Sequence, residues 1–341
     1  MIGREKEQCL KIDLMREYDM SRPRIAIASK SYGVHCKKAI ELLEEFAAVD
    51  RKNVSNNDEM RSIVVDYDGV IIGNEKMDRD VLISSDKLKI IARHGVGVDN
   101  IDLDAATKKG IIVTYTPQSN ADSVAEYTIM LMLGIARNFP KASYGISNGK
   151  WIRLLGSELL CRTVGIIGFG AVGRRVAKKL SGFDAKILAY DPFVKESEIE
   201  KEGVLPVSLD ELLRTSDFVT LHVSLSTETH HLINGDRLRL MKKSAFLINT
   251  SRGSIIDEIS LSNSLKNGEI SGAALDVFEQ EPITKDNPLL KLDNVILSPH
   301  MANFTSEALI RMDMMNAEDL KRFFQGNKPL FIANPKVFTG R

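Results

Sequence analysis

The sequence has no excess of charge of either sign and no cysteine pattern. Lysine plus arginine and aspartate plus glutamate each total 46 in the 341 residues, so the formal net charge is zero. A neutral chain has no basic field with which to hold a polyanion, and we therefore expect no nucleic-acid partner. Cys9, Cys36 and Cys161 lie far apart without a C-x-x-C pair, which argues against a disulfide framework and a zinc cluster. We predict no metal site and the reducing cytoplasm as the compartment.

Long apolar runs are absent as well. The longest, near residues 129–136, is too short to cross a bilayer. The first twenty residues are charged throughout and lack the apolar core of a signal peptide. We therefore expect a soluble protein with no membrane partner, in which residues 1–22 form an N-terminal extension ahead of the first strand-like segment.

What the sequence does contain is 43% hydrophobic residues and two series of short apolar runs that alternate with helical patterns. Such alternation is typical of βαβ units around a parallel sheet. The first series runs from Arg24 to residue 116. The second contains six strand-like segments, at 163–168, 185–190, 217–223, 245–250, 272–277 and 294–298. We predict an α/β fold of two doubly wound parallel sheets, one flavodoxin-like and one a Rossmann dinucleotide-binding sheet.

Two helical patterns set the predicted domain boundaries. Residues 119–139 carry apolar side chains on nearly every face, which predicts a buried helix with Ser119 or Asn120 as its N-cap. Residues 305–326 are helical again and come too late to extend the second sheet. We therefore predict a Rossmann NAD-binding domain at 119–305, inserted into a substrate-binding domain made of residues 23–118 and 306–341.

A glycine motif follows the first strand of the second series. Gly168, Gly170 and Gly173 form G-x-G-x-x-G between a strand and a helix, the context that dinucleotide binding requires. The first glycine makes the tight turn, the second lets the backbone approach a pyrophosphate, and the third lets helix and strand pack closely. We predict that this turn binds the cofactor.

Asp191 ends the next strand-like segment, about 20 residues after the glycines. A carboxylate at this point accepts hydrogen bonds from the adenosine ribose hydroxyls and repels a 2′-phosphate. The sequence therefore favours NAD over NADP.

Three polar residues follow strands of the same series. Arg252 lies after 245–250, Glu281 after 272–277 and His300 after 294–298. Ligands of open α/β sheets bind outside the carboxyl ends of the strands, so we expect these side chains to gather at one edge. An imidazole can move a proton during hydride transfer, a carboxylate can orient and charge that imidazole, and a guanidinium can grip a carboxylate substrate. Each alone also has a structural explanation, but together they predict catalysis on a 2-hydroxy or 2-keto acid.

At this point the chain resembles the D-isomer-specific 2-hydroxyacid dehydrogenases over roughly residues 24 to 335. The matching segments, in the family's order, are "RHGVGVDNIDLDAATKKGI", "NADSVAEYT", "VGIIGFGAVG", "MKKSAFLINTSRGSIIDE", "GAALDVFEQEP" and "NVILSPH". The resemblance implies that Arg252, Glu281 and His300 are the catalytic triad.

The resemblance also implies the remaining site residues. Those implied to bind the cofactor are Gly168, Gly170, Val172, Gly173, Asp191, Thr250, Ser251 and Asp276. Those implied to bind the substrate are Gly95, Val96, Gly97, Asn120 and Arg252. His94 belongs to the same substrate loop and is expected to reach the cleft, whereas His35, His230 and His231 fit no partner pattern.

The substrate remains open at this stage. The chain is similar to phosphoglycerate dehydrogenase-like members, yet Gly73, Asn74, Glu75 and Lys76 stand where those enzymes usually carry an Arg-Ser pair for the phosphate. A glyoxylate or hydroxypyruvate reductase is the alternative enzyme. A different class is the NAD(H)-sensing corepressor-like binding proteins, which keep the same triad. The resemblance further implies a homodimer built through the cofactor domain, with residues 140–160 at its interface.

Overall fold

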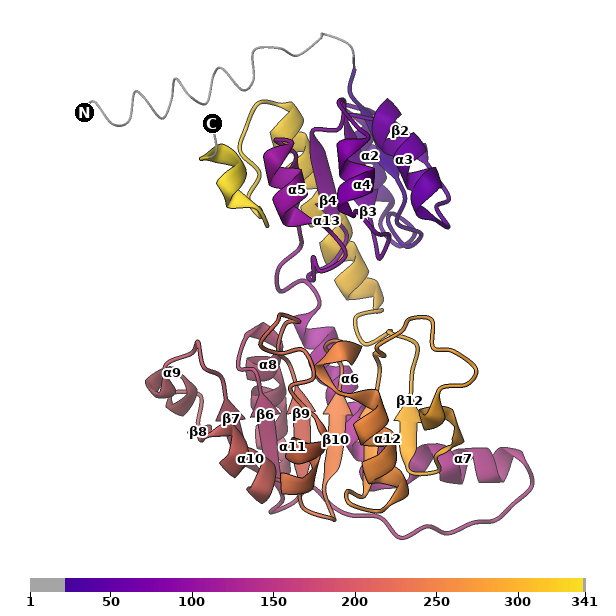
Figure 1. Cartoon of the computed structure of the whole chain (residues 1–341), viewed down its shortest axis with the longest axis vertical. Helices are drawn as coiled ribbons and strands as arrows, with labels where there is room; N and C mark the ends of the chain where they lie inside the picture. Colours follow the sequence, from indigo (N-terminus) through magenta and orange to yellow (C-terminus); the bar gives the residue numbers. More distant parts are fainter. Residues whose placement is uncertain (1–21, 340–341) are drawn as a thin grey trace. The chain divides into compact units, whose positions relative to one another are not determined.

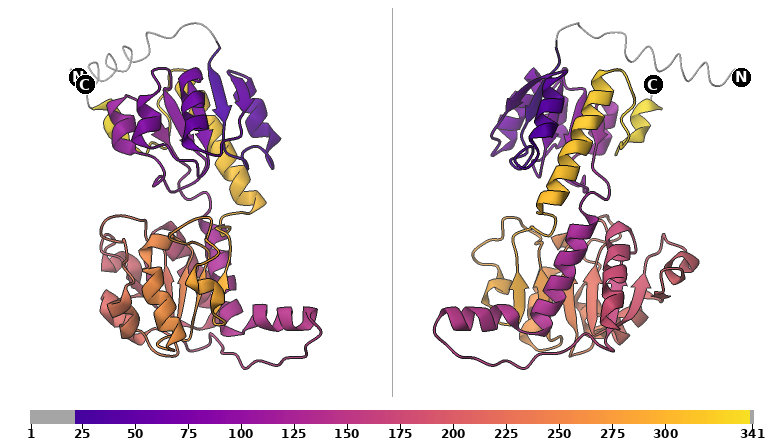
Figure 2. Two further views of the ribbon diagram at one scale, coloured as in Figure 1. Left: turned by 45° about the vertical axis from the view of Figure 1, so that its right-hand side comes forward. Right: turned by 180° about the vertical axis from the view of Figure 1, so that it is seen from behind.

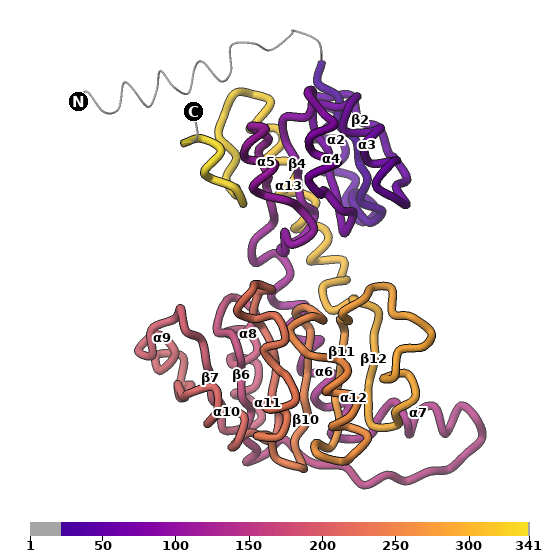
Figure 3. The backbone as a smooth tube through the Cα atoms, in the orientation of Figure 1, coloured from indigo at the N-terminus to yellow at the C-terminus, as the bar shows by residue number. Residues whose placement is uncertain are grey.

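The computed structural model describes residues 22–339, so the predicted N-terminal extension lies outside the described residues except for Arg22. The chain divides into two compact units. Unit 1 contains the residues up to Ser119 together with those from Ser306 onward, and unit 2 runs from Asn120 to Thr305. Figure 1 colours them along the sequence, and Figure 3 traces the same backbone as a tube.

Unit 1 is built on a five-stranded parallel sheet in the order β2-β1-β3-β4-β5. This is the flavodoxin-like order, in which the first crossover runs one way and the later ones the other. Its strands are β1 (Arg24–Ile27), β2 (Ala48–Arg51), β3 (Gly69–Ile72), β4 (Ile90–Arg93) and β5 (Ile112–Thr114). Its helices are α2 (Lys37–Glu44), α3 (Asn57–Asp66), α4 (Arg79–Ile83), α5 (Leu103–Lys108), α13 (Ser306–Phe324) and the 3-10 turn η4 (Pro335–Phe338).

The core of unit 1 follows from the composition of its central strands. Every residue of β3 and of β4 is buried, as expected for parallel strands with helices on both faces. Helix α13, far away in sequence, packs against α2 and β4 (Figure 1). The last long helix of the chain therefore completes the unit that the first strand began.

Unit 2 contains a seven-stranded parallel sheet in the order β12-β11-β10-β9-β6-β7-β8. Numbered from β6, this is the Rossmann order 3-2-1-4-5-6 with one more strand at the end. The strands are β6 (Thr163–Ile167), β7 (Lys186–Tyr190), β8 (Leu205–Pro206), β9 (Phe218–Leu221), β10 (Phe246–Asn249), β11 (Gly272–Leu275) and β12 (Val295–Leu297). The α-helices are α6 (Ala121–Ala136), α7 (Phe139–Ser147), α8 (Ala171–Leu180), α9 (Glu196–Glu200), α10 (Leu209–Thr215), α11 (Gly235–Leu240) and α12 (Glu258–Lys266). The 3-10 turns are η1 (Ser181–Phe183), η2 (Gly253–Ile255) and η3 (Pro288–Lys291).

The predicted fold class, two doubly wound parallel sheets, is confirmed. The prediction of six strands in the second sheet was one strand short, because β8 has only two residues and offers no alternation to read. All the register partners in both sheets are parallel. The carboxyl ends of β10, β11 and β12 therefore meet at one edge.

Helix α6 begins after Asn120, whose side chain makes no capping hydrogen bond. Most of its residues are buried, and it packs against α8, β10 and β11. The expectation of a buried helix is therefore correct. Asn120 is the N-cap residue by its backbone position, but its side chain does not cap the helix.

Helix α7 and the segment that follows it project from the rest of unit 2 (Figure 2). Trp151 is 87% exposed and Leu155 is 95% exposed, although both are large and apolar. Asn138 Nδ2 donates to the carbonyl oxygen of Leu155 and Ser157 N–H donates to that of Ala136, which brings the chain back to α6. Residues 139–157, called the arm below, therefore present large apolar side chains to solvent.

Residues 22–339 contain neither a membrane-spanning helix nor a cluster of metal ligands. No helix there has the length and apolarity to cross a membrane. No three or more histidine, cysteine, aspartate or glutamate side chains there gather as metal ligands would.

Candidate active site

The three glycines of the motif in unit 2 occupy three different environments. Gly168 has φ +93°, a conformation that glycine adopts without a steric penalty, and an added Cβ would lie 2.7 Å from backbone atoms of His222. A Cβ on Gly173 would lie 2.2 Å from the carbonyl oxygen of Gly168, so this glycine lets α8 pack onto β6. A Cβ on Gly170 would meet nothing within 4 Å. Gly170 thus leaves open space at the turn, where a pyrophosphate would approach.

The start of α8 is suited to an anion. Gly170 is its N-cap residue and provides no side-chain acceptor for the first helical N–H groups, which include that of Val172. No acidic residue lies in the first turn. Free N–H groups and the positive end of the helix dipole bind phosphate. The residues present at this turn therefore fit a dinucleotide.

Asp191 lies directly after β7 and holds the same turn together. Its Oδ2 accepts a hydrogen bond from Phe169 N–H at 2.8 Å, and its Oδ1 accepts one from Phe193 N–H at 2.9 Å. The carboxylate is thereby fixed beside the glycine turn. A carboxylate oxygen has more than one lone pair, so Asp191 keeps capacity for ribose hydroxyls.

Arg252 and Glu281 come from adjacent strand ends. Gly253, which follows Arg252, is so close to Phe278 that an added Cβ would lie 1.8 Å from the Phe278 carbonyl carbon. Only glycine permits this approach, and it brings the loop after β10 onto the loop after β11. Arg252 Nη1 donates to the carbonyl oxygen of Ser251 at 2.7 Å, and Asn249 Nδ2 donates to the carbonyl oxygen of Arg252. The arginine is therefore held at its backbone and at its guanidinium.

His300 and Glu281 form a direct pair. His300 Nδ1 lies 2.6 Å from Oε2 of Glu281, and the two side chains are 30% and 33% exposed. Glu281 Oε1 accepts from Phe278 N–H at 3.0 Å. Within residues 22–339 the other ring nitrogen of His300, Nε2, has no hydrogen-bond partner. One nitrogen is thus oriented by a carboxylate while the second remains available for a proton transfer.

The pKa of Glu281 is lowered from its usual range. Burial alone raises it, but the hydrogen bond with His300 and the charge of His300, the N–H of Phe278 and the charge of Arg252 together outweigh burial. The carboxylate therefore stays ionised into acidic solution and stabilises a positive charge on the imidazole.

Asp276 holds the loop that carries His300. It is fully buried, and its carboxylate accepts from Ser298 Oγ at 2.7 Å, Met301 N–H at 3.0 Å and Ala302 N–H at 2.8 Å. Its carbonyl oxygen accepts from His300 N–H at 2.7 Å. Burial raises the pKa of Asp276 above its usual value, although the hydrogen bonds from these three donors lower it in part. The four contacts support His300 in the left-handed conformation, at φ +50°, which is uncommon for a residue with a side chain.

The other predicted cofactor residues lie at the end of β10. Thr250 is nearly buried, and its Oγ1 lies 3.0 Å from Oγ1 of Thr128 on α6. Ser251 Oγ donates to Asn249 Oδ1 at 2.8 Å. The loop after β10 is therefore ordered by side chains on both sides.

In unit 1, Arg93 shapes the loop of Gly95, Val96 and Gly97, called the 95–97 loop below. Arg93 Nε donates to the carbonyl oxygen of Gly97 at 2.9 Å, and Nη1 donates to that of His94. Within the described chain, the N–H groups of Val96 and Gly97 have no hydrogen-bond partner. Carbonyl oxygens face a guanidinium while two adjacent N–H groups stay open, and this arrangement is suited to a carboxylate.

Sequence reasoning was wrong about two histidines. His94 was expected to reach the cleft, but its side chain is only 2% exposed and lies between Ser29 and Asp313 inside unit 1. His231 seemed to have no partner, but its Nε2 lies 3.0 Å from Oε1 of Glu279. Both partners are distant in sequence, so spacing carried no signal for either pair.

The comparisons with known proteins agree with this geometry. The family model for the D-isomer specific 2-hydroxyacid dehydrogenase NAD binding domain matches residues 129–302. A D-3-phosphoglycerate dehydrogenase of Methanocaldococcus jannaschii is 44% identical over 292 residues, which cover 84% of this chain and 56% of that protein. The chain thus spans about half the length of that relative.

Two further relatives match over almost their whole length. A glyoxylate reductase of Aeropyrum pernix is 39% identical over 336 residues, with 94% of this chain and 99% of that protein covered. The structure of a D-lactate dehydrogenase of Aquifex aeolicus, complexed with NAD and lactic acid, superimposes with a TM-score of 0.79 at 30% identity, covering 93% of this chain and 98% of that chain. The chain belongs to the D-isomer specific 2-hydroxyacid dehydrogenase family.

Proposed function

We propose that the protein is an NAD-dependent oxidoreductase that interconverts a D-2-hydroxy acid and the corresponding 2-keto acid. The observation that carries this proposal is the 2.6 Å pair of His300 and Glu281 with Arg252 on the adjacent loop. When bound, the nicotinamide cofactor supplies or accepts the hydride. The catalytic residues are Arg252, Glu281 and His300, and each has one task.

His300 moves the proton. During oxidation its Nε2 takes the proton of the substrate hydroxyl, and during reduction the same nitrogen returns it to the carbonyl oxygen. Glu281 holds Nδ1 and stabilises the charged ring. Arg252 binds the substrate carboxylate bidentately and polarises the neighbouring carbonyl.

The open N–H groups of Val96 and Gly97 in the 95–97 loop are proposed to bind the substrate carboxylate as well. Asn120 is proposed as a further substrate residue. Gly168, Gly170, Val172, Gly173 and Asp191 hold the dinucleotide, with Thr250, Ser251 and Asp276 at the nicotinamide end. Asp191 makes NAD the favoured cofactor, since its charge repels a 2′-phosphate.

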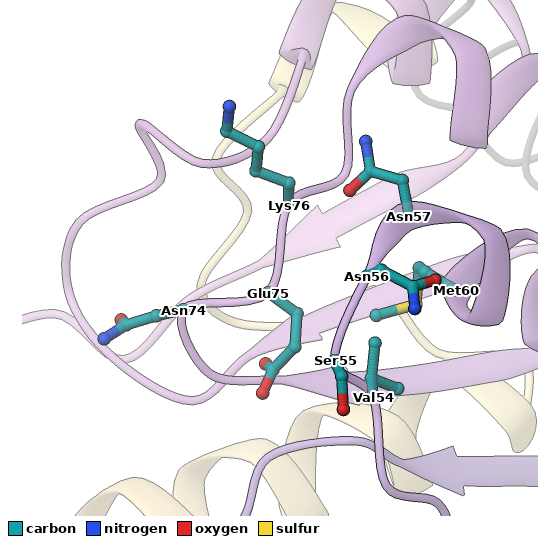
Figure 4. Close-up of a pocket in the computed structure, with 8 residues that line it drawn as sticks. All are labelled: Val54, Ser55, Asn56, Asn57, Met60, Asn74, Glu75 and Lys76. Carbon is teal, nitrogen blue, oxygen red and sulfur yellow. The ribbon is translucent and has the colours of Figure 1, made fainter. Parts of the chain in front are cut away.

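The segment of residues 73–76 in unit 1 favours a small unphosphorylated acid over phosphoglycerate, because it contains no arginine to bind a phosphate. Three of its residues line a pocket of about 340 Å³, whose full lining is Val54, Ser55, Asn56, Asn57, Met60, Asn74, Glu75 and Lys76. Figure 4 shows the Glu75 carboxylate directed to the side of Ser55 and Val54, whereas Lys76 points the opposite way. Asn74 Oδ1 accepts from Arg93, which also holds Gly97, so this segment is tied to the 95–97 loop. With these four residues in place of the Arg-Ser pair, no arginine would bind a phosphate and the Glu75 carboxylate would repel it.

The exposed arm of unit 2 supports a homodimer through the cofactor domain. The large apolar residues exposed on it are Phe139, Tyr144, Ile146, Trp151, Ile152 and Leu155. Apolar side chains in such number on a projecting segment are typical of an interface. We place the protein in the cytoplasm as a homodimer with small-molecule substrates, and sedimentation of the purified protein tests the dimer.

The activity is tested by mixing the purified protein with NADH and each of glyoxylate, hydroxypyruvate, phosphohydroxypyruvate, pyruvate and 2-ketoisocaproate, and following NADH absorbance. We expect turnover with glyoxylate or hydroxypyruvate and little with the phosphorylated acid. Faster turnover of phosphohydroxypyruvate would reverse the substrate assignment. NADH binding without turnover of any acid would favour the corepressor-like binding protein.

A further inference from the structure

A buried polar network in unit 1 involves residues that have no role in the proposed chemistry. His94 Nδ1 lies 3.0 Å from Ser29 Oγ, in the segment after β1. His94 Nε2 lies 2.9 Å from Oδ1 of Asp313 on α13, at ion-pair distance but off the axis of a hydrogen bond. Asp313 is fully buried, and its Oδ2 accepts from Gly33 N–H at 3.0 Å. One imidazole therefore joins three segments that are distant in sequence.

The network is enclosed by protein. Tyr32 is fully buried, and its ring meets that of His94 edge to face with centroids 5.3 Å apart. Tyr32 OH donates to the carbonyl oxygen of Asp313 at 3.1 Å. Burial and the nearby Asp313 carboxylate raise the pKa of Tyr32 well above its usual value, so the phenol stays neutral. A buried carboxylate that loses its partner is costly, and His94 is the partner in contact with it.

The network ends at the 95–97 loop. Gly95 follows His94 directly, so a displacement of the His94 backbone reaches the loop at its first residue. With φ +154° and the Arg93 guanidinium 2.5 Å from where a Cβ would lie, only glycine fits at this position. Helix α13 makes a second contact at the same place, since Asn316 Nδ2 donates to the carbonyl oxygen of Arg93 at 3.2 Å. Arg93 thus binds the carbonyl groups on either side of the loop, and α13 binds the backbone of Arg93, just before the loop begins.

We propose that the buried pair of His94 and Asp313, together with Ser29, is a positioning device that fixes the 95–97 loop to helix α13 and so sets the affinity for the substrate carboxylate. This rests on the proposed function, because it assumes that Val96 and Gly97 bind that carboxylate. The contact to a carboxylate is the same in the ground state and in the transition state. Its loss therefore raises KM more than it lowers kcat.

The test compares His94→Ala, Asp313→Asn and Ser29→Ala with the wild-type holoenzyme. We expect KM for the preferred 2-keto acid to rise about tenfold or more in the first two variants, because the loss of one hydrogen bond to a charged group is enough to change affinity by roughly that factor. The change in kcat is expected to be smaller, and NADH affinity is expected to stay unchanged because the glycine turn belongs to unit 2. His94→Gln keeps a donor near Asp313 and should recover part of the affinity.

Asp319→Asn is the matched control. Asp319 is also a buried carboxylate of α13, and it accepts from Leu330 N–H and Phe331 N–H without touching the loop. Its replacement should lower the melting temperature but leave KM unchanged. Equal KM increases in Asp319→Asn and Asp313→Asn, or a wild-type KM in a folded His94→Ala, would overturn the proposal. If His94→Ala does not fold, Asp313→Asn and Ser29→Ala decide by the same criterion.

Hydrogen exchange separates this proposal from the proposed function. The amides of residues 95–97 should exchange faster in His94→Ala or Asp313→Asn than in the wild type or Asp319→Asn, whatever the activity. If the wild type reduces no keto acid but exchange changes as expected, the proposed function fails and the positioning device stands. Unchanged exchange together with wild-type KM rejects the device alone.

Discussion

Nδ1 of His300 lies 2.6 Å from Oε2 of Glu281, and the N–H of the same histidine donates to the carbonyl oxygen of Asp276. Both partners follow β11, so the loop after that strand orients the ring of His300 and also holds its backbone. Two restraints on one residue leave Nε2 with a defined direction, which is what a proton donor needs in order to act on a bound substrate.

Replacing His300 tests the proton transfer. His300→Ala is expected to lower kcat about 10²- to 10⁴-fold, the usual contribution of a general acid or base. The affinity for NADH, measured by fluorescence titration, should stay near that of the wild type because the glycine turn is untouched. Turnover at the wild-type rate would remove His300 from the mechanism.

Glu281→Gln tests the charge beside the imidazole. The lowered pKa of Glu281 keeps its carboxylate ionised through neutral and mildly acidic solution. Keto-acid reduction draws a proton from the imidazole, and glutamine lacks the charge that stabilises the protonated ring, so kcat at neutral pH should fall about tenfold or more. Glu279→Gln is the control, because Glu279 lies on the same loop as Glu281 but pairs with His231 instead of His300. An equal fall of kcat in both variants would contradict the assignment.

Arg252→Lys tests the bidentate binding of the substrate carboxylate. Lysine keeps the charge but lacks the planar pair of donors. We expect kcat/KM to fall on the order of a hundredfold, equivalent to about 2.7 kcal/mol of transition-state stabilisation. Arg214→Lys, at an exposed position of α10, should change nothing. Wild-type kinetics in Arg252→Lys would mean that a positive charge alone is sufficient to bind the substrate, which would contradict bidentate binding.

Asp191→Asn tests the choice of cofactor. The asparagine retains an oxygen that can accept from one of the two N–H groups that Asp191 holds, while the negative charge is lost. Charges about 4 Å apart near a protein surface interact by a few kcal/mol, so the preference for NADH over NADPH should narrow at least about tenfold. The measurement is kcat/KM for both cofactors. A wild type that already prefers NADPH would contradict the ribose argument.

His222 makes a prediction about stability. Desolvation lowers its pKa from 6.5 to about 3. As pH falls from about 6.5 toward 3, the unfolded chain binds a proton that the folded chain does not, so the free energy of unfolding decreases, by at most about 1.4 kcal/mol per pH unit. Denaturant unfolding of His222→Gln should lose less stability over this interval than the wild type. Equal losses would show that other groups dominate the acid response. His35→Gln, at an exposed histidine, is the control.

The polar residues at strand ends could be predicted from the sequence because the carboxyl ends of parallel strands lie at one edge of the sheet. Arg252, Glu281 and His300 each follow an apolar run, and parallel strands bring such positions to one edge whatever the details of packing. The same holds for Gly168, Gly170 and Gly173, whose roles differ but whose spacing is local. These predictions needed only the direction of the strands.

Contacts between segments that are distant in the sequence could not be predicted from it. The sequence suggested a nicotinamide role for Asp276, and only the fold reveals that its carboxylate also holds Ser298, Met301 and Ala302. Strand β2 was missed because its AVDR residues are partly exposed at a sheet edge, where no apolar run is required.

The sequence by itself determined two parallel α/β sheets, a dinucleotide turn and the set of residues at the sheet edge, because local periodicity and short spacings encode them. Only the tertiary structure decided what surrounds those residues. His94 lies beside Gly95 in the chain, but its direction depends on Asp313, 219 residues later, which reaches it because α13 packs back onto β4. Burial is a property of that packing, and no local pattern specifies it.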